Sequence, residues 1–199
     1  NTIKHSDFIF TKINLSNLNE VQNLCFPKND TSEALLINNA ARIGKIIPLH
    51  LKLNADIIND YNLNIISPTI LCAKFINSFY KNKIILNIGS GAANNPISSW
   101  GTYCSAKSAL DMLTNVIAIE NKPNLTIFSI HPGIVDTEMQ AEIRSANHNF
   151  FPLLNKFKNY YNNNELENSK TVAKKLLYII KNHAKFNRNI LSIRDIKIT

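Results

Sequence analysis

The sequence predicts an α/β protein with a Rossmann-like, doubly wound parallel sheet. Runs rich in Ile, Leu, Val and Phe recur along the 199 residues, and segments of helical period separate them. The runs are apolar throughout rather than alternating, which is typical of parallel strands buried on both faces. Because 45% of the residues are hydrophobic, one sizeable core can form, and we expect a single domain over residues 1–199.

The apolar runs predict the strands, and the segments of helical period predict the helices. Strands are expected, in chain order, at residues 8–13, 34–37, 84–88, 125–130 and 190–193. Helices are expected at residues 18–26, 59–80, 103–120 and 171–181. Residues 150–168 are polar with interspersed aromatics, so they interrupt the alternation of strands and helices. They are either a segment that contributes to function or an ordinary surface segment.

Pro68 leaves the course of the second expected helix open. A proline inside a helix removes the hydrogen bond to the carbonyl four residues earlier, here that of Asn64. Alternatively, the helix begins near Ser67 and Pro68 occupies its first turn.

Composition and charge exclude several classes of protein. The formal net charge is +8, but Lys residues are scattered among Asn and Ile rather than gathered, so we expect no nucleic-acid partner. No apolar run reaches the roughly 18 residues of a membrane span, and no signal peptide is visible. Cys25, Cys72 and Cys104 are odd in number and far apart, which indicates a reducing, cytoplasmic location. Neither Cys nor His has metal-ligand spacing, so no metal is expected.

Ser90, Tyr103 and Lys107 lie in one stretch and together could transfer a proton. Tyr103 and Lys107 are at i and i+4, so on a helix they share a face. The Lys107 cation is expected to lower the pKa of Tyr103 from its usual value of about 10. Ser90 follows the run 84–88, at the end of a strand where α/β sheets bind ligands. This set suits protonation of a carbonyl oxygen while a hydride reaches its carbon.

Three further segments complete the pattern: residues 36–41 (LINNAA), residues 131–137 (HPGIVDT) and Asn64. Together with the triad they resemble the short-chain dehydrogenase/reductase family. There, the first segment follows the fourth strand, the second closes over the nicotinamide, and an asparagine at the position of Asn64 completes the proton relay. Residues 100–107, 111–113, 122–124 and 136–140 are most similar to the branch of benzil and sepiapterin reductases.

The resemblance implies an NADPH-dependent carbonyl reductase acting on a small dicarbonyl, with NAD not excluded. In this reading Tyr103 is the acid, Ser90 holds the carbonyl oxygen, and Lys107 and Asn64 complete the relay. Asn38 is expected to be structural. The cofactor-binding positions implied by the resemblance are Asn14, Leu15, Asn39, Tyr103, Lys107, Val135 and Thr137. Relatives also pair through two helices, here residues 64–80 and 103–120, so we expect a homodimer.

Three departures from the family pattern qualify this interpretation. The family's opening turn, Thr-Gly-x-x-x-Gly-x-Gly, holds the cofactor pyrophosphate, and it does not occur here. We therefore interpret the chain as lacking the family's first βαβ unit; the alternative is a non-catalytic remnant that acts, if at all, through interactions. Ala41 replaces a glycine, which would cost about 1 kcal/mol if that position needs a positive φ. Gly89 stands where relatives often have a second Ser.

Overall fold

The core of the protein is a parallel four-stranded sheet, as the sequence predicts. The computed structural model describes residues 5, 7–27, 32–79, 81–120 and 122–198. The sheet order is β1-β2-β3-β4, with every neighbouring pair parallel. The strands are β1 at Glu33–Asn38, β2 at Asn82–Ile88, β3 at Leu125–His131 and β4 at Ile190–Ser192.

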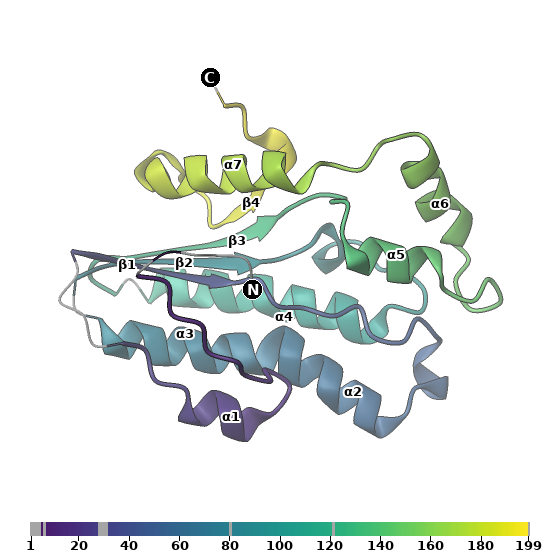
Figure 1. Ribbon diagram of the computed structural model, residues 1–199, viewed down its shortest axis with the longest axis horizontal. Coiled ribbons are helices and arrows are strands. Elements are labelled where there is room, and N and C mark those ends of the chain that lie inside the picture. The colour runs from purple at the N-terminus through teal and green to yellow at the C-terminus, as the bar shows by residue number, and fades with distance from the viewer. Residues whose placement is uncertain (1–4, 6, 28–31, 80, 121, 199) are drawn as a thin grey trace.

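Helices cover both faces of this sheet, which confirms the doubly wound class (Figure 1). Helix α7 (Ser169–Lys181) lies on one face, and α3 (Ser67–Ser78) and α4 (Gly101–Ile119) lie on the other. Helices α1 (Leu18–Asn23) and α2 (Asn54–Tyr61) lie on the α3 side, whereas α5 (Glu138–Arg144) and α6 (Leu154–Asn162) lie beyond the carboxyl ends of the strands. Short 3-10 helices occur at Leu49–Leu51, Gly91–Ala93, His183–Lys185 and Ile193–Asp195.

The central strands are buried on both faces, which explains their continuous apolar sequence. On the α7 side, Ile84 and Leu86 of β2 pack with Phe128 and Ile130 of β3. On the other side, Ile85 and Ile127 pack with Cys72 and Phe75 of α3. Both side-chain positions of the strand period therefore face a helix layer.

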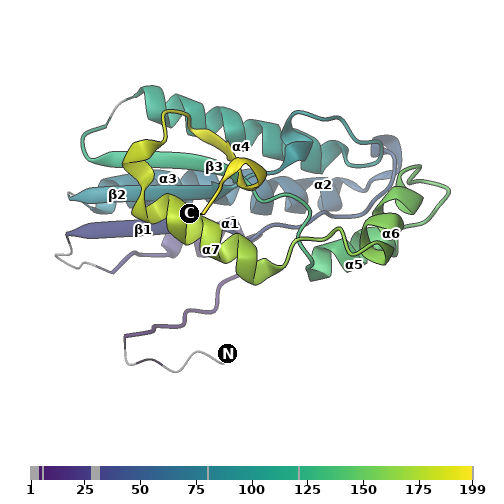
Figure 2. The ribbon, with the colours of Figure 1, turned by 90° about the horizontal axis from the view of Figure 1, so that it is seen from above.

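The expected strand at residues 8–13 is wrong. These residues form no strand, and Phe8, Ile9 and Phe10 are 40%, 80% and 66% exposed. The described part of the N-terminal segment runs out beyond β1, away from the sheet (Figure 2). A strand needs a neighbour to bond its backbone, and within the described residues none lies beside this segment. The apolar run alone therefore does not make it a strand.

A single helical run extends from Asn54 to Ser78 and passes through Pro68. Helix α2 continues into a π-helical segment, Asn62–Ile66, and then into α3. Ile66, just before α3, has helical dihedrals (φ −65°, ψ −48°), so the helix does not begin at Ser67. The missing Pro68 amide is accommodated by the wider π turn that precedes it. The predicted terminus of this helix, Tyr80, lies outside the described residues.

Buried amides connect the strands just below the carboxyl edge of the sheet. The Asn38 Nδ2 donates to Asn87 Oδ1 at 2.8 Å, and the Asn87 Nδ2 donates to Thr114 Oγ1 on α4 at 3.0 Å. Asn87 and Thr114 are fully buried, and Asn38 is 8% exposed. Asn38 therefore links β1 to β2 and has the structural place that the sequence suggested.

One further property concerns the helices. Among the described residues, no helix is both long and apolar enough to span a bilayer.

Candidate active site

Ser90 lies at the carboxyl edge of the sheet, two residues after β2. Its backbone is extended, and its side chain caps the 3-10 helix Gly91–Ala93. The Ala92 amide donates to Ser90 Oγ at 3.1 Å. Because this bond uses a lone pair, the hydroxyl proton remains available to a second partner.

Tyr103 and Lys107 lie on the first two turns of α4, next to Ser90. Their exposed fractions are 7% and 3%. The Lys107 Nζ is 5.6 Å from the centroid of the Tyr103 ring and donates to the carbonyl oxygen of Ile88 at 2.7 Å. The Ser90 side chain is near enough to Tyr103 to act on the phenol as a hydrogen-bonding group and lower its pKa. The structure therefore brings the three predicted residues together.

Burial dominates the electrostatics of this pair and overturns one expectation. Burial raises the pKa of Tyr103 above its ordinary value, and the hydrogen bond with Ser90 opposes this only partly. Burial also lowers the pKa of Lys107 to about 8, against the field of Asp111. The expected lowering of the Tyr103 pKa is therefore wrong for this structure, because desolvation of the buried phenol outweighs the opposing effect of Ser90.

Asn64 binds the backbone of the loop that follows β1. Its Oδ1 accepts from the amide of Arg42 at 3.0 Å, and its Nδ2 donates to the carbonyl oxygen of Arg42 at 2.9 Å. The side chain is thus used in positioning the loop, and only the main chain of Asn64 remains for the relay that the family resemblance implies. Ala41, just before Arg42, does not have a positive φ, so its Cβ causes no strain there.

A buried ionic cluster holds the same loop against α2 and α4. The Asp60 carboxylate, fully buried, accepts from Lys52 Nζ at 2.5 Å and from Thr102 Oγ1 at 2.8 Å. Its other oxygen pairs with Arg42 Nε at 3.0 Å. Since Thr102 precedes Tyr103 on α4, this cluster connects the loop to the first turn of that helix.

A second buried cluster lies beside Lys107, and the sequence reasoning missed it. Asp111, one turn after Lys107 on α4, accepts from Ser129 Oγ at 2.5 Å and from His131 Nε2 at 2.8 Å, both on β3. A Cβ on Gly89 would lie 2.4 Å from Ser129 Oγ, so the backbone before Ser90 packs directly on this cluster. The i, i+4 spacing of Lys107 and Asp111 was a usable signal, but the β3 partners require the fold.

The residues expected to bind a cofactor divide into two groups. Asn39 follows β1 at the carboxyl edge, and Val135 and Thr137 follow β3 at that edge, with Val135 bridged to Glu167. Asn14 and Leu15 instead lie before α1, where the Asn14 amide donates to Glu20 and the Leu15 carbonyl oxygen accepts from Ser67. Neither of these two is hydrogen-bonded to the triad in the described structure.

The residues at the carboxyl edge of the sheet fit the nicotinamide and ribose half of a nicotinamide coenzyme. Lys107 uses one ammonium proton on Ile88, and an ammonium carries three, so two can serve ribose hydroxyls. The β3 loop offers Val135 and Thr137 at the same edge. For the pyrophosphate, the 199 residues contain no Gly-rich turn of the type that cradles it.

An aromatic wall closes the site beside Tyr103. Trp100 meets the Tyr103 ring edge-on at 5.6 Å between centroids and stacks on Phe151 at 5.7 Å. Phe157 of α6 contacts both Trp100 and Phe151. The polar-looking segment 150–168 therefore contains a helix that packs its aromatic residues onto the candidate site.

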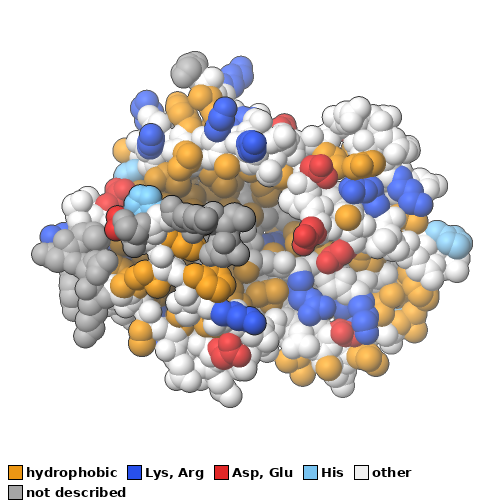
Figure 3. Space-filling view, viewed as in Figure 1, with side chains coloured by type: hydrophobic (Ala, Val, Ile, Leu, Met, Phe, Trp, Pro, Cys, Tyr) orange, Lys and Arg blue, Asp and Glu red, His pale blue; other side chains and the backbone are white. Residues whose placement is uncertain are grey.

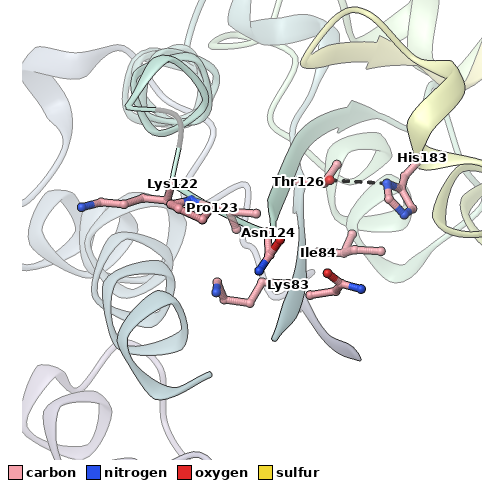
Figure 4. A pocket seen from close by; sticks show the side chains of 9 residues that line it. Lys83, Ile84, Lys122, Pro123, Asn124, Thr126 and His183 are labelled. Carbon is pink, nitrogen blue, oxygen red and sulfur yellow. Dashed lines mark hydrogen bonds between the residues drawn. The ribbon is translucent and has the colours of Figure 1, made fainter. Parts of the chain in front are cut away.

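A separate pocket lies at the opposite, amino edge of the sheet. Its lining comes from the start of β2 and of β3 and from His183, whose Nδ1 is 3.4 Å from Thr126 Oγ1 (Figure 4). None of the triad contributes to it. In the described part of the chain, no group of three or more His, Cys, Asp or Glu could hold a metal ion.

Comparisons with known proteins show the family to which the chain belongs. The family model described as short chain dehydrogenase matches residues 2–148. The benzil reductase ((S)-benzoin forming) of Bacillus subtilis is 30% identical over 98% of this chain and 84% of its own length. That of Bacillus cereus is 32% identical over 65% of this chain, and the sepiapterin reductase of Rattus norvegicus is 34% identical over 73%. The matched parts span 55% and 57% of those two proteins.

Solved structures agree on the fold. A short chain dehydrogenase/reductase from Saccharomyces cerevisiae superposes with a TM-score of 0.80, at 22% identity, over 93% of this chain and 76% of that one. A 4-hydroxyisoleucine dehydrogenase gives a TM-score of 0.73 at 24% identity, over 92% of this chain and 75% of its own. With a matching family model over residues 2–148 and a relative aligned along nearly the whole chain, this protein belongs to the short-chain dehydrogenase/reductase family.

Proposed function

We propose that this short-chain oxidoreductase is an NADPH-dependent carbonyl reductase that acts on a small dicarbonyl of the benzil or sepiapterin kind. The observation that carries the proposal is the junction of Ser90, Tyr103 and Lys107 at the carboxyl edge of the sheet. The names of the relatives support the substrate class. The choice of NADPH over NADH follows the family resemblance, and an assay with both coenzymes tests it.

The chemistry needs a hydride and a proton, and the chain's own residues supply the proton. When bound, a reduced nicotinamide coenzyme supplies the hydride that the carbonyl carbon receives. Ser90 donates a hydrogen bond to the carbonyl oxygen, and Tyr103 Oη gives that oxygen its proton, so the C=O becomes an alcohol. Burial raises the pKa of Tyr103, so the phenol keeps its proton until the carbonyl oxygen takes it.

Lys107 and Asn64 complete the relay in this proposal. The Lys107 cation beside the Tyr103 ring stabilises the phenolate that forms as the proton leaves. Its remaining ammonium protons serve the ribose, and the Asn64 main chain connects Lys107 to solvent, as the family resemblance implies. Asn39, Val135 and Thr137 contact the coenzyme from the edge of the sheet, and Asn14 and Leu15 are proposed for its adenosine side.

The substrate side favours an apolar carbonyl compound. The wall around Tyr103 consists of Trp100, Phe151 and Phe157, each 7% exposed or less. These rings pack on one another and make the surroundings of Tyr103 apolar, which favours a substrate with little charge. We therefore choose benzil as the test substrate.

Location and assembly belong to the same proposal. Cys25, Cys72 and Cys104 are free thiols, which fits a reducing compartment such as the cytoplasm. A homodimer through α3 and α4 is proposed. The second candidate function, a non-catalytic remnant, rests on the lack of a Gly-rich turn in the 199 residues.

The test is benzil reduction by the purified chain, followed as loss of NADPH absorbance, with Tyr103→Phe as the variant. The variant should lose at least about 100-fold in turnover, since only the transferable proton is removed. Coenzyme binding, read from Trp100 fluorescence, should be unchanged. Tyr178→Phe, which removes a hydroxyl from α7 on the other face of the sheet, is the control. If Tyr103→Phe keeps most of the turnover, Tyr103 is not the acid; if the wild-type chain binds no coenzyme, the remnant reading holds.

A further inference from the structure

Asp111 is the buried carboxylate next to the proposed relay on α4. It lies one helical turn after Lys107, on the same face, and is 8% exposed. Its two oxygens accept from Ser129 Oγ and His131 Nε2 at 2.5 and 2.8 Å. Both donors belong to β3, so the carboxylate is held by a different element from the one that carries it.

The position of this carboxylate is fixed by close packing as well as by hydrogen bonds. A Cβ on Gly89 would lie 2.4 Å from Ser129 Oγ, 2.8 Å from His131 Cδ2 and 3.0 Å from Asp111 Oδ1. Cβ atoms are essentially never found within 3.0 Å of another heavy atom, so a side chain at position 89 would force Ser129 or His131 to shift. The cluster therefore sets the path of the chain into Ser90 on one side and faces Lys107 on the other.

Lys107 needs such a neighbour because its ammonium is buried and donates to a neutral carbonyl. It is 3% exposed, and its Nζ donates to Ile88 O. Burial lowers the pKa of Lys107 to about 8, and the field of Asp111 is what opposes the loss of the proton. A cation is stabilised by an opposite charge nearby far more in a dry site than in water.

We propose that Asp111 is a positioning residue of the reductase site, whose carboxylate, anchored by Ser129 and His131, keeps Lys107 in its ammonium form. The proposal rests on the proposed function for its catalytic meaning, but the charge of Lys107 can be measured without catalysis. Asp111 itself touches neither substrate nor coenzyme in this account; it acts through Lys107.

The other titratable groups around this part of α4 do not replace Asp111. Tyr103 and Cys104 lie on α4 itself and are neutral when protonated. His131, on β3, reaches Lys107 only through Asp111. Asp60, on α2, is already bound by Lys52 and Arg42. The π-helical segment Asn62–Ile66, β4 and the Gly91–Ala93 turn carry no acidic residue.

The direct experiment is an NMR titration of Lys107 in the full chain without coenzyme, using lysine labelled at Cε and Nζ. The signal is assigned by its loss in Lys107→Arg. In Asp111→Asn, which keeps the size of the side chain and removes its charge, the Lys107 midpoint should fall by about one pH unit from its wild-type value. The His131 ring can accept from the new amide by changing tautomer, so the packing is retained.

Two controls separate charge from structure. Ser129→Ala releases one hydrogen bond and keeps the charge, so its Lys107 midpoint should stay within about 0.3 units of wild type, a fraction of the shift that one nearby charge causes. Glu120→Gln removes a charge at the far end of the same helix, about 20 Å away, and should shift nothing. An unshifted midpoint in Asp111→Asn, or an equal shift in Ser129→Ala, would overturn the proposal.

The catalytic readout is the pH profile of benzil reduction. In Asp111→Asn the alkaline fall of kcat/KM should begin about one unit lower, following Lys107, whereas a purely structural defect would lower the rate at every pH alike. If the wild-type chain reduces no carbonyl, the proposed function fails and the NMR result still decides the role of Asp111. If the chain is active and the profile does not move, only the role of Asp111 fails.

Discussion

At the scale of a single residue, Gly89 shows how the side chains of β3 limit what can precede Ser90. Relatives often have a second serine there, and the replacement looks neutral from the sequence because the catalytic hydroxyl of Ser90 is kept. In the structure the space of that side chain is taken by Ser129 Oγ and the His131 ring. The lack of a side chain at Gly89 therefore makes room for Ser129 and His131 of β3.

Gly89→Ser should therefore destabilise the protein by about 2 to 3 kcal/mol, the cost of overpacking a buried site. Urea unfolding of the variant measures this. Adding Ser129→Ala removes the nearest clash and should restore part of the loss, since His131 Cδ2 remains 2.8 Å from the added Cβ. Equal stability of Gly89→Ser and wild type would show that the backbone moves aside at no cost.

The triad was predictable because it is local. Ser90 ends a strand, and Tyr103 and Lys107 share one helix face, so spacing alone places them together. The Asp111 cluster is not predictable in this way, because Ser129 and His131 come next to Asp111 only when β3 pairs with β2. The predicted direction of the Tyr103 pKa shift is also wrong, because a sequence shows which residues are charged but not how deeply the phenol is buried.

Among the elements, the helical run Asn54–Ser78 does most to position the site. Its π-helical segment presents Asn64 to the loop after β1, and the extra residue of a π turn allows this within a continuous helix. Periodicity predicts the helix but not the π turn. Residues 8–13 show the opposite case, because their strand propensity is high but none of the described strands pairs with them.

Asn64→Ala should free the loop after β1. Both polar groups of the Arg42 backbone lose their partner, at a cost of about 2 to 3 kcal/mol in unfolding free energy. Hydrogen exchange should show the Arg42 amide losing its protection. Asn59→Ala, on the exposed face of α2, is the matched control. Continued protection of Arg42 in the Asn64 variant would mean that the ionic pair with Asp60 is enough to hold the loop.

At the scale of the molecule, apolar surface is distributed unevenly. The space-filling view shows hydrophobic side chains gathered in the hollow below α7 (Figure 3). On the helices of the other layer, Ile58, Met112 and Ile119 are 58%, 63% and 81% exposed. Met112 and Ile119 lie on α4 with Val116, 40% exposed, between them, and such a series of exposed apolar side chains indicates a contact surface.

For the proposed homodimer, Met112→Glu combined with Val116→Glu on α4 should give a monomer. Two buried carboxylates at a pairing surface would each need desolvation without a partner. Light scattering at micromolar concentration measures the mass of both proteins. Leu177→Glu, on the exposed side of α7, is the control. A monomeric mass for the wild-type chain itself would remove the proposal.

The amide chain Asn38–Asn87–Thr114 has a consequence for how the sheet can assemble. A slip of β1 by one residue would turn Asn38 toward the opposite face and leave Ile37 against Asn87, so that the buried Asn87 Oδ1 loses the donor it has in Asn38. Apolar strands such as β1 and β2 carry little information of their own about alignment, because Ile and Leu pack almost equally well one step along. The two asparagines make that misaligned pairing expensive, and they do so next to the edge where Ser90 must be placed.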